Sequence, residues 1–194
     1  WLHEEGATLN VGLELDTDPS TGIRSMIIQE EVAEGQEIFF VPSSAMITTE
    51  QAKTNNLGLQ TCKNSDDNSP QTCKNGDENS PVLHDLNSTV HALFLLQQRV
   101  AGARWEPWAN LFPASFQDMP LYYGQDDLKE FQASPVRQEI EREQRHVTED
   151  YVHAAALVPN LTFNEFRWAR CVVASRQFQV KWRTDGQIAG ESIL

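Results

Sequence analysis

The first fifty positions alternate between apolar and polar residues in a way that predicts β-strands. Apolar side chains recur at every second position over 11–15, which is the period of a half-buried strand. A run of turn-forming residues over 16–22 separates this strand from an apolar run over 25–28. Residues 37–42 predict a further strand, which the proline at its end would terminate.

The middle of the chain changes to helical spacing. Asn87 or Ser88 can cap a helix whose apolar residues follow at intervals of three and four positions. Three prolines and many aromatic residues over 104–123 instead indicate a packed, irregular connection. A helical part with one irregular stretch is therefore predicted.

Two further helix starts are predicted after this connection. Ser134 and Pro135 form an N-cap followed by a first-turn proline. Thr162 and Glu165 have the spacing of a capping box. The helix that begins at Pro135 has an apolar stripe that would face the core, consisting of Val136, Ile140, Val147, Tyr151 and Ala154.

The end of the chain returns to the alternation of strands. Phe178, Val180 and Trp182 alternate with polar residues, and a turn at 185–186 leads into a strand over 187–194. The order along the chain is therefore strands, helices and strands again. This order predicts an α+β fold in which a helical insertion interrupts a sheet domain, not a repeating βαβ unit.

Residues 60–81 differ from the rest of the chain because they contain a tandem repeat. The eleven-residue units 60–70 and 71–81 differ at two positions and have no apolar face to bury. Their Asp and Asn residues lack the ordered ligand series of a calcium-binding loop. We therefore expect a flexible surface insertion here.

Charge and composition exclude two classes of function. The 194 residues include 15 basic and 28 acidic ones, a net charge of −13, which disfavours nucleic-acid binding because such binding depends on Lys and Arg. No apolar run approaches the ~20 residues that a membrane-spanning helix needs. An acidic surface suits a basic protein partner, although most acidic surfaces only keep a protein in solution.

The cysteines indicate a reducing, intracellular compartment. Cys62, Cys73 and Cys171 are odd in number and lack the spacing of a metal site.

The chain begins at Trp1 without an initiator methionine or the pattern of a signal peptide. We therefore expect a piece of a longer protein.

Few residues suggest chemistry when they are considered by themselves. His146, Glu149 and His153 share one face of the predicted long helix and could hold a metal, but solvent-exposed histidines beside carboxylates are the favoured interpretation. Cys171 lies on an apolar helix and is interpreted as a core residue. Arg176 closes that helix just before a strand. There it could clamp a carboxylate or neutralise the helix C-terminus, and the residues alone leave both roles open.

Four stretches carry patterns that belong together. Residues 23–42 contain an opening strand, a turn like I-x-x-G-E and a V-P stop, and 105–123 are similar to W-x-P-Y…L-P…P-x-x-W. Residues 163–169 are similar to F-x-x-F-x-W-A, and 175–178 match S-R-x-F. In this order and spacing the patterns resemble the N-terminal part of the SET-domain protein methyltransferases of the Rubisco large-subunit methyltransferase type, which include lysine and actin-histidine methyltransferases.

The resemblance implies a SET-type fold, with small twisted β-sheets split by a large helical insertion. Residues 1–50 would form the N-terminal part of the SET β-domain and 51–86 a flexible insert with the tandem repeat. Residues 87–165 would form the helical insertion, and 166–194 the return into the SET domain. In the family a cofactor-binding Asn-His segment and a catalytic tyrosine follow, which would lie beyond Leu194. We therefore expect this piece alone to be inactive.

The resemblance also implies site residues, while neither a metal site nor a catalytic residue is expected within the chain. The residues expected to bind S-adenosyl-L-methionine are Gly22, Ile23, Arg24, Ser25 and Arg176. The residues expected to contact the substrate are Ser175, Arg176 and Phe178.

The implied activity is methyl transfer from S-adenosyl-L-methionine to a lysine of another protein, with a histidine acceptor as the alternative. A second alternative, from a different class, is a catalytically inactive SET-like module that binds a protein partner. Ile23 and Ser25 stand where the family has glycines, which favours the inactive module. The intact S-R-x-F pattern favours the enzyme. We expect a monomer without nucleic-acid or membrane partners.

Overall fold

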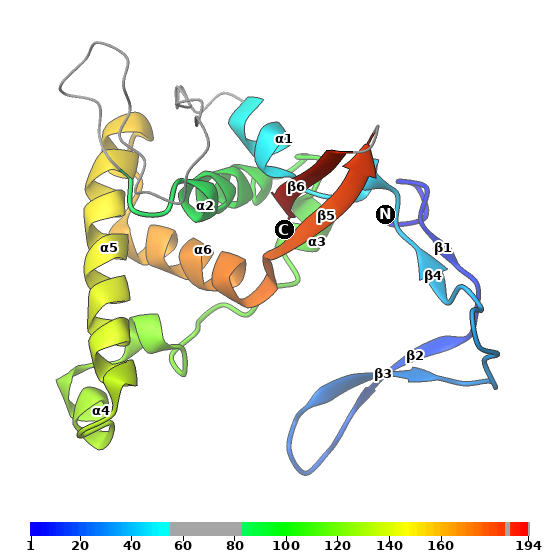
Figure 1. The fold of residues 1–194 in the computed structure, drawn as a ribbon, viewed down its shortest axis with the longest axis horizontal. Helices are drawn as coiled ribbons and strands as arrows, with labels where there is room; N and C mark the ends of the chain where they lie inside the picture. The colour runs from blue at the N-terminus through cyan, green and yellow to red at the C-terminus, as the bar shows by residue number, and fades with distance from the viewer. Residues whose placement is uncertain (55–82, 185–186, 194) are drawn as a thin grey trace. The chain divides into compact units, whose positions relative to one another are not determined.

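The computed structural model describes residues 1–54, 83–184 and 187–193, which fall into two compact units, Trp1–Met46 and Ile47–Leu194 (Figure 1). Helices and small antiparallel sheets both occur among the described residues, and no closed barrel is found there. The predicted α+β class is therefore confirmed. The division into four segments that the sequence suggests stays a prediction.

The first unit is built from short antiparallel strand pairs. β1 (Thr8–Leu9) pairs with β4 (Phe39–Phe40), and β2 (Leu13–Thr17) pairs with β3 (Arg24–Ile28). The two strands predicted on either side of the first turn are thus confirmed as a hairpin. The strand predicted over 37–42 is shorter than expected because pairing is confined to the two residues of β4. A 3-10 turn, η1 (Ser43–Ala45), follows it.

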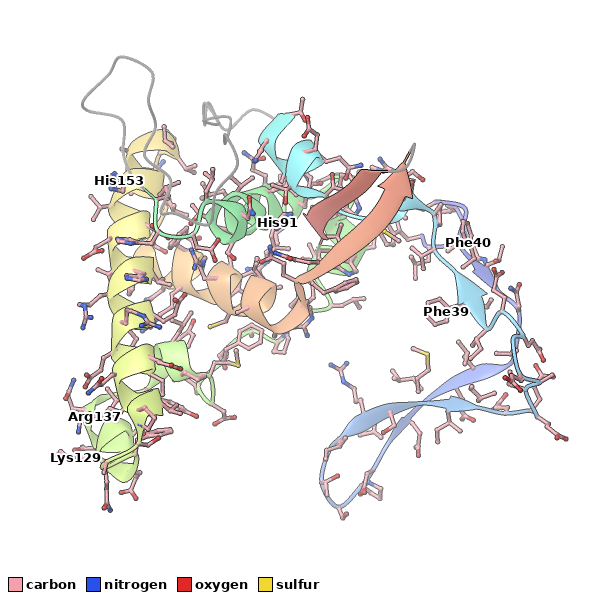
Figure 2. All side chains as sticks on the ribbon, viewed as in Figure 1. Phe39, Phe40, His91, Lys129, Arg137 and His153 are labelled. Carbon is pink, nitrogen blue, oxygen red and sulfur yellow. The ribbon has the colours of Figure 1, made fainter. Side chains whose placement is uncertain are left out.

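One face of the β2–β3 hairpin is apolar. Leu13 lies opposite Ile28, and Leu15 lies opposite Met26. Directly opposed residues of an antiparallel pair share a face, so these four side chains form one apolar stripe. Leu15 and Met26 are 65% and 66% exposed, and the aromatic side chains of β4 are also exposed (Figure 2).

The second unit contains the longer elements. Its described helical segments are α1 (Thr49–Thr54), α2 (Leu86–Gln98), α3 (Glu106–Ala109), η2 (Pro120–Tyr122), α4 (Gln125–Glu130), α5 (Pro135–Leu157) and α6 (Phe163–Arg176). Its two strands, β5 (Phe178–Thr184) and β6 (Gln187–Ile193), pair antiparallel, which confirms the predicted strands at this end of the chain. α2 packs against α6, and α5 packs against both (Figure 1). β6 packs against α1, and a bridge joins Ile193 to Thr48, the residue just before that helix.

The core of the second unit lies between α2 and α6. Its fully buried apolar side chains on these helices include Val90, Leu93, Phe94, Leu95, Phe166, Ala169, Val172 and Val173. Each large member contributes roughly 1.5–3 kcal/mol to folding by leaving water. The ring of Phe94 also meets the indole of Trp105 edge-on at a centroid distance of 5.4 Å, which fixes the start of α3 against α2.

The helix starts follow the predicted caps with one correction. α6 has the predicted capping box, because the Glu165 amide donates to the Thr162 hydroxyl over 3.3 Å and the Thr162 amide donates to the Glu165 carboxylate over 3.0 Å. α5 begins at Pro135 after its Ser134 cap. The prediction that Asn87 or Ser88 caps α2 is wrong. Asp85 is the cap, since its carboxylate accepts the Ser88 amide over 2.9 Å.

The apolar stripe predicted on α5 is only partly buried. Ile140, Val147 and Ala154 lie in the core, whereas Val136 in the first turn is 44% exposed. Asp150 lies on the same face and is fully buried, which the apolar pattern alone did not predict. The connection over 104–123 is irregular as predicted, but it also contains the short segments α3 and η2. The short helices α1 and α4 are not among the sequence predictions.

Two predictions lie outside the described residues. These are the tandem repeat over 60–81 and the turn at 185–186. Among the helices that are described, none combines the length and the apolar character that crossing a lipid bilayer would require.

Candidate functional site

The predicted substrate-contacting residues lie where α6 ends and β5 begins. Arg176 is the last residue of α6, and Phe178 is the first residue of β5. A guanidinium in the last helical turn is favourable because the carbonyl end of a helix carries partial negative charge. The side chain of Gln177 ties this junction to α2, since its amide oxygen accepts a hydrogen bond from the Ser88 hydroxyl over 3.0 Å.

Ser175 holds the Arg176 side chain in place. The Ser175 hydroxyl accepts a hydrogen bond from Nη1 of Arg176 over 2.6 Å and donates to the carbonyl of Val172 over 3.0 Å. The guanidinium carbon lies 4.6 Å from the centroid of the Phe112 ring, which is a cation–π contact. Arg176 is half-buried, whereas Phe178 is 60% exposed. The structure thus brings Ser175 and Arg176 together and adds Phe112, which was not predicted as a site residue.

An aromatic cluster from three segments surrounds Phe112. Its ring meets that of Trp108 edge-on at 4.6 Å and that of Trp168 at 6.4 Å between centroids. The indole N–H of Trp168 donates to the carbonyl of Pro113 over 2.8 Å. Arg99, just after α2, lies over the Trp168 ring at 4.2 Å. The connection between α3 and η2 is therefore fixed against α6 beside Arg176.

The predicted cofactor-binding residues 22–25 lie in the first unit, at the turn of the β2–β3 hairpin. Gly22 has φ +69, a left-handed conformation that glycine adopts without strain. The amides of Ser20 and Thr21 and the Ser20 hydroxyl donate to the carboxylate of Asp18. These hydrogen bonds, that of the Ser20 hydroxyl first, hold the pKa of the Asp18 carboxyl below its ordinary value.

The backbone of this turn is already engaged at two of the predicted positions. The Gly22 amide donates to the Asp18 carbonyl over 2.8 Å, and the Ile23 amide donates to the Thr21 hydroxyl over 3.3 Å. The Ile23 side chain is 62% exposed. Arg24 and Ser25 lie in β3, opposite Thr17 and Asp16 respectively. The Ile23 carbonyl accepts the Asp18 amide over 3.0 Å, so a ligand at this turn would meet exposed side chains rather than the amides of Gly22 and Ile23 or this carbonyl.

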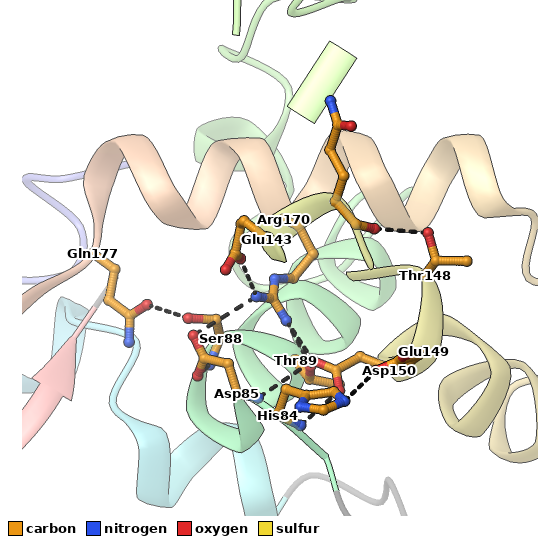
Figure 3. Close-up of polar contacts among 11 residues, drawn as sticks. His84, Asp85, Ser88, Thr89, Glu143, Thr148, Glu149, Asp150, Arg170 and Gln177 are labelled. Atoms are coloured by element: carbon orange, nitrogen blue, oxygen red, sulfur yellow. Dashed lines mark hydrogen bonds and ion pairs between the residues drawn. The ribbon is translucent and has the colours of Figure 1, made fainter. Parts of the chain in front are cut away.

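A buried ion-pair network lies in the second unit and was missed by the sequence analysis (Figure 3). Arg170 of α6 is 3% exposed, and Asp150 of α5 is fully buried. Nη1 of Arg170 donates to Asp150 over 3.0 Å and to the hydroxyl of Thr89 over 2.9 Å. Nη2 lies 3.2 Å from a carboxylate oxygen of Glu143 and 3.7 Å from one of Asp85.

Asp150 connects this network to the start of α2. Its carboxylate accepts the backbone amides of His84 over 2.7 Å and Asp85 over 3.3 Å, and the hydroxyl of Thr89 over 3.3 Å. Every close partner of this carboxylate is a donor, as a buried anion requires. The sequence signal was an arginine and an aspartate at positions that helical spacing places among apolar residues. The network accounts structurally for both charges.

His84, which precedes α2, forms a ring stack and an ion pair with residues of α5. The rings of His84 and His146 lie parallel, with centroids 4.1 Å apart, and Nε2 of His84 contacts the carboxylate of Glu149. In the part of the chain that the structure describes, no group of three or more His, Cys, Asp or Glu side chains could hold a metal ion. Glu149 thus pairs with His84 from outside the helix, while His146 and His153 of α5 are half-buried rather than solvent-exposed.

Cys171 is a core residue, as predicted. The side chain is fully buried on α6. Burial raises the pKa of its thiol to about 11, because the anionic form would lose its hydration. The reactive thiolate is therefore scarce at neutral pH, which favours the structural role of Cys171 over a nucleophilic one.

The amino-acid sequence is similar to a group of known enzymes. No family model matches the chain. It is 25% identical to the actin-histidine N-methyltransferase of Xenopus tropicalis, with 93% of this chain and 30% of that protein aligned. The enzymes of that name from Homo sapiens and Rhinolophus ferrumequinum are each 22% identical over 93% of this chain and 29% of their own length. The chain is therefore similar, along nearly all of its length, to less than a third of these protein-histidine methyltransferases.

Proposed function

We propose that this chain is part of a protein N-methyltransferase of the SET type that uses S-adenosyl-L-methionine. The observation that carries the proposal is the similarity of 93% of the chain to part of the actin-histidine N-methyltransferases. The arrangement at the end of α6 supports it, because the S-R-x-F arginine is held by a neighbouring hydroxyl and an aromatic ring. The order of strands, helices and strands supports a split SET fold.

Arg176 is the residue of the second unit that fits the cofactor best. Bound S-adenosyl-L-methionine supplies a methyl group on a positively charged sulfur and carries an amino-acid carboxylate. A guanidinium binds a carboxylate through two parallel N–H donors. The hydrogen bond from Arg176 to the Ser175 hydroxyl fixes the direction in which these N–H donors point. We assign Arg176 to the carboxylate of the amino-acid part.

A cofactor role for the hairpin turn of the first unit is proposed from the resemblance of the sequence patterns. Gly22 and Ile23 donate their amides within the turn and the Ile23 carbonyl accepts the Asp18 amide, so a contribution from Ile23 would come from its exposed side chain. Arg24 and Ser25 follow in β3.

Ser175 and Phe178, next to Arg176, are assigned to contacts with the protein substrate that accepts the methyl group. Phe178 is exposed and can contribute apolar area to a substrate side chain.

The acceptor is a nitrogen of another protein. The names of the relatives favour a histidine, and the sequence patterns predict a lysine. Both reactions need a neutral nitrogen in line with the methyl group and shielded from water, so both fit one kind of site. The net charge of −13 suits an acceptor segment rich in basic residues.

Calorimetry of S-adenosyl-L-methionine binding tests the proposal. The chain covers 29–30% of the relatives, so the full-length protein and this chain are compared. We expect binding by the full-length protein. Its Arg176→Ala variant should lose at least ~1.5 kcal/mol of binding free energy, as expected for one charge-assisted hydrogen bond. The matched control is Arg137→Ala, which removes an arginine on α5 that pairs with Glu141 (Figure 2).

Transfer of a labelled methyl group identifies the acceptor. Purified actin and a mixture of histone proteins serve as probes, and hydrolysis of the product separates methylhistidine from methyllysine. A folded full-length protein that binds no S-adenosyl-L-methionine would contradict the enzyme and favour the alternative, an inactive SET-like module that binds a protein partner. Equal losses for Arg176→Ala and Arg137→Ala would remove Arg176 from the site.

A further inference from the structure

A ring from the connection between α3 and η2 supports the functional end of α6. The guanidinium carbon of Arg176 lies 4.6 Å from the centroid of Phe112. Phe112 belongs to no helix or strand, and it is half-buried. It reaches Arg176 from a segment far away in the sequence. Because the two residues are held by different parts of the second unit, their contact depends on how those parts are packed.

The position of the Phe112 ring is fixed by its neighbours and does not depend on Arg176. Trp108 meets the ring at an interplanar angle of 87°, and Trp168 meets it at 60°. The hydrogen bond from the Trp168 indole to the Pro113 carbonyl, 2.8 Å long, anchors the following residue. A ring restrained on two sides and at its backbone is a rigid surface for a cation.

The contact with the Phe112 ring and the hydrogen bond to Ser175 restrain the guanidinium in different ways. All N–H groups of arginine lie in the plane of the guanidinium, and the ring that lies against its central carbon, 4.6 Å from centroid to carbon, limits where the cation can move. The bond from Nη1 to the Ser175 hydroxyl limits rotation within the plane. Together they fix the direction in which the in-plane donors meet an acceptor.

We propose that Phe112 is a positioning residue, which orients the Arg176 guanidinium toward the carboxylate of the ligand at the proposed methyl-transfer site. This inference rests on the proposed function. Preorganisation of this kind improves affinity because less side-chain freedom is lost when the ligand binds. Phe112 itself is expected to make no contact with the ligand.

The test uses the full-length protein and S-adenosyl-L-methionine as the probe, with dissociation constants from calorimetry. Phe112→Leu keeps an apolar side chain but removes the π face, and Phe112→Tyr keeps the ring. We expect Phe112→Leu to weaken binding roughly two- to fivefold, which is the range of a partly exposed cation–π contact. Phe112→Tyr is expected to bind as the wild type does. In an Arg176→Ala background, Phe112→Leu should have no further effect, because the group that it orients is gone.

Thermal unfolding of each variant checks that the fold is kept. Three results would overturn the inference while leaving the proposed function in place: binding unchanged in Phe112→Leu, equal losses in Phe112→Leu and Phe112→Tyr, or the same additional loss when Arg176 is already alanine. Absence of binding by the folded wild-type protein is a different result. It would reject the proposed function, and the assignment of Phe112 with it.

Discussion

Breaking the buried ion pair between Arg170 and Asp150 should destabilise the second unit more than any surface substitution. The Asp150→Leu variant has an apolar side chain of similar size, but it leaves the buried guanidinium without its closest carboxylate. It also removes the acceptor of the His84 and Asp85 amides. Removing one partner of a buried pair costs about 3–5 kcal/mol, and because Glu143 and Asp85 still lie near the Arg170 guanidinium we expect the lower end of that range, about 3 kcal/mol. That is a large share of the roughly 5–15 kcal/mol by which a domain is stable.

Urea unfolding followed by tryptophan fluorescence measures this loss, since Trp168 lies on the same helix as Arg170. A loss of about 3 kcal/mol, divided by a typical dependence of roughly 1–3 kcal/mol per molar urea, lowers the midpoint by about 1–3 M. The matched control is Glu141→Gln, which breaks the half-buried pair that Glu141 forms with Arg137 one turn away on α5. A pair of that kind contributes only about 0.3–0.5 kcal/mol.

A double substitution separates the charge effect from the packing effect. Asp150→Leu combined with Arg170→Met removes both charges, and buried pairs replaced in this way often lose little stability or gain some. We expect the double variant to be more stable than Asp150→Leu alone. The reasoning fails if Asp150→Leu costs no more than the Glu141→Gln control, or if the two single losses simply add in the double variant.

Three further predictions concern α6. Cys171 should resist a maleimide in the native protein at pH 8 and react after denaturation, because burial raises the pKa of its thiol to about 11. Peptide mass spectrometry measures the labelling of that residue. Rapid labelling of the native protein would contradict its place in the core. Thr162→Ala should cost about 1 kcal/mol in urea unfolding through loss of the helix cap, and a cost near zero would mean that the capping box does not form. The hydrogen bonds from Thr162 lower the pKa of Glu165, so ionised Glu165 stabilises the fold above its ordinary value of 4.5 and that stabilisation is lost as the pH falls through the lowered pKa. The stability difference between the wild type and Glu165→Gln should therefore be largest near pH 7 and should disappear in acid. A stability difference that does not change with pH would refute the assignment of this stabilisation to ionised Glu165.

Local signals predicted much of the fold. The hairpin follows from period-two apolar residues on both sides of a turn, and α6 follows from the box formed by Thr162 and Glu165. These signals lie within a few residues of the structure that they predict. The true cap of α2 was missed although it is equally local, because Asp85 lies before the apolar pattern begins and Asn87 and Ser88 are also good caps.

Contacts between distant segments could not be predicted in the same way. Helical spacing places Arg170 and Asp150 among apolar residues, but only the packing of α2, α5 and α6 shows that the two charges are buried together and pair. The contact of Phe112 with Arg176 likewise depends on the path of an irregular segment without periodicity. Ser175 and Arg176 were found because they are adjacent in the sequence. The cofactor role predicted for residues 22–25 rests on the resemblance to a family.

The buried network has a consequence for the order in which the chain is made. On the ribosome Asp150 is synthesised before Arg170, and the two are 20 residues apart in the sequence. Until α6 has emerged, docking α5 on α2 would bury a carboxylate without its cationic partner, which is costly. We therefore expect these helices to stay loosely associated during translation and to assemble only when the last helix is available. In that interval the nascent second unit would depend on chaperones, and a ribosome stalled between α5 and α6 would hold a protease-sensitive chain.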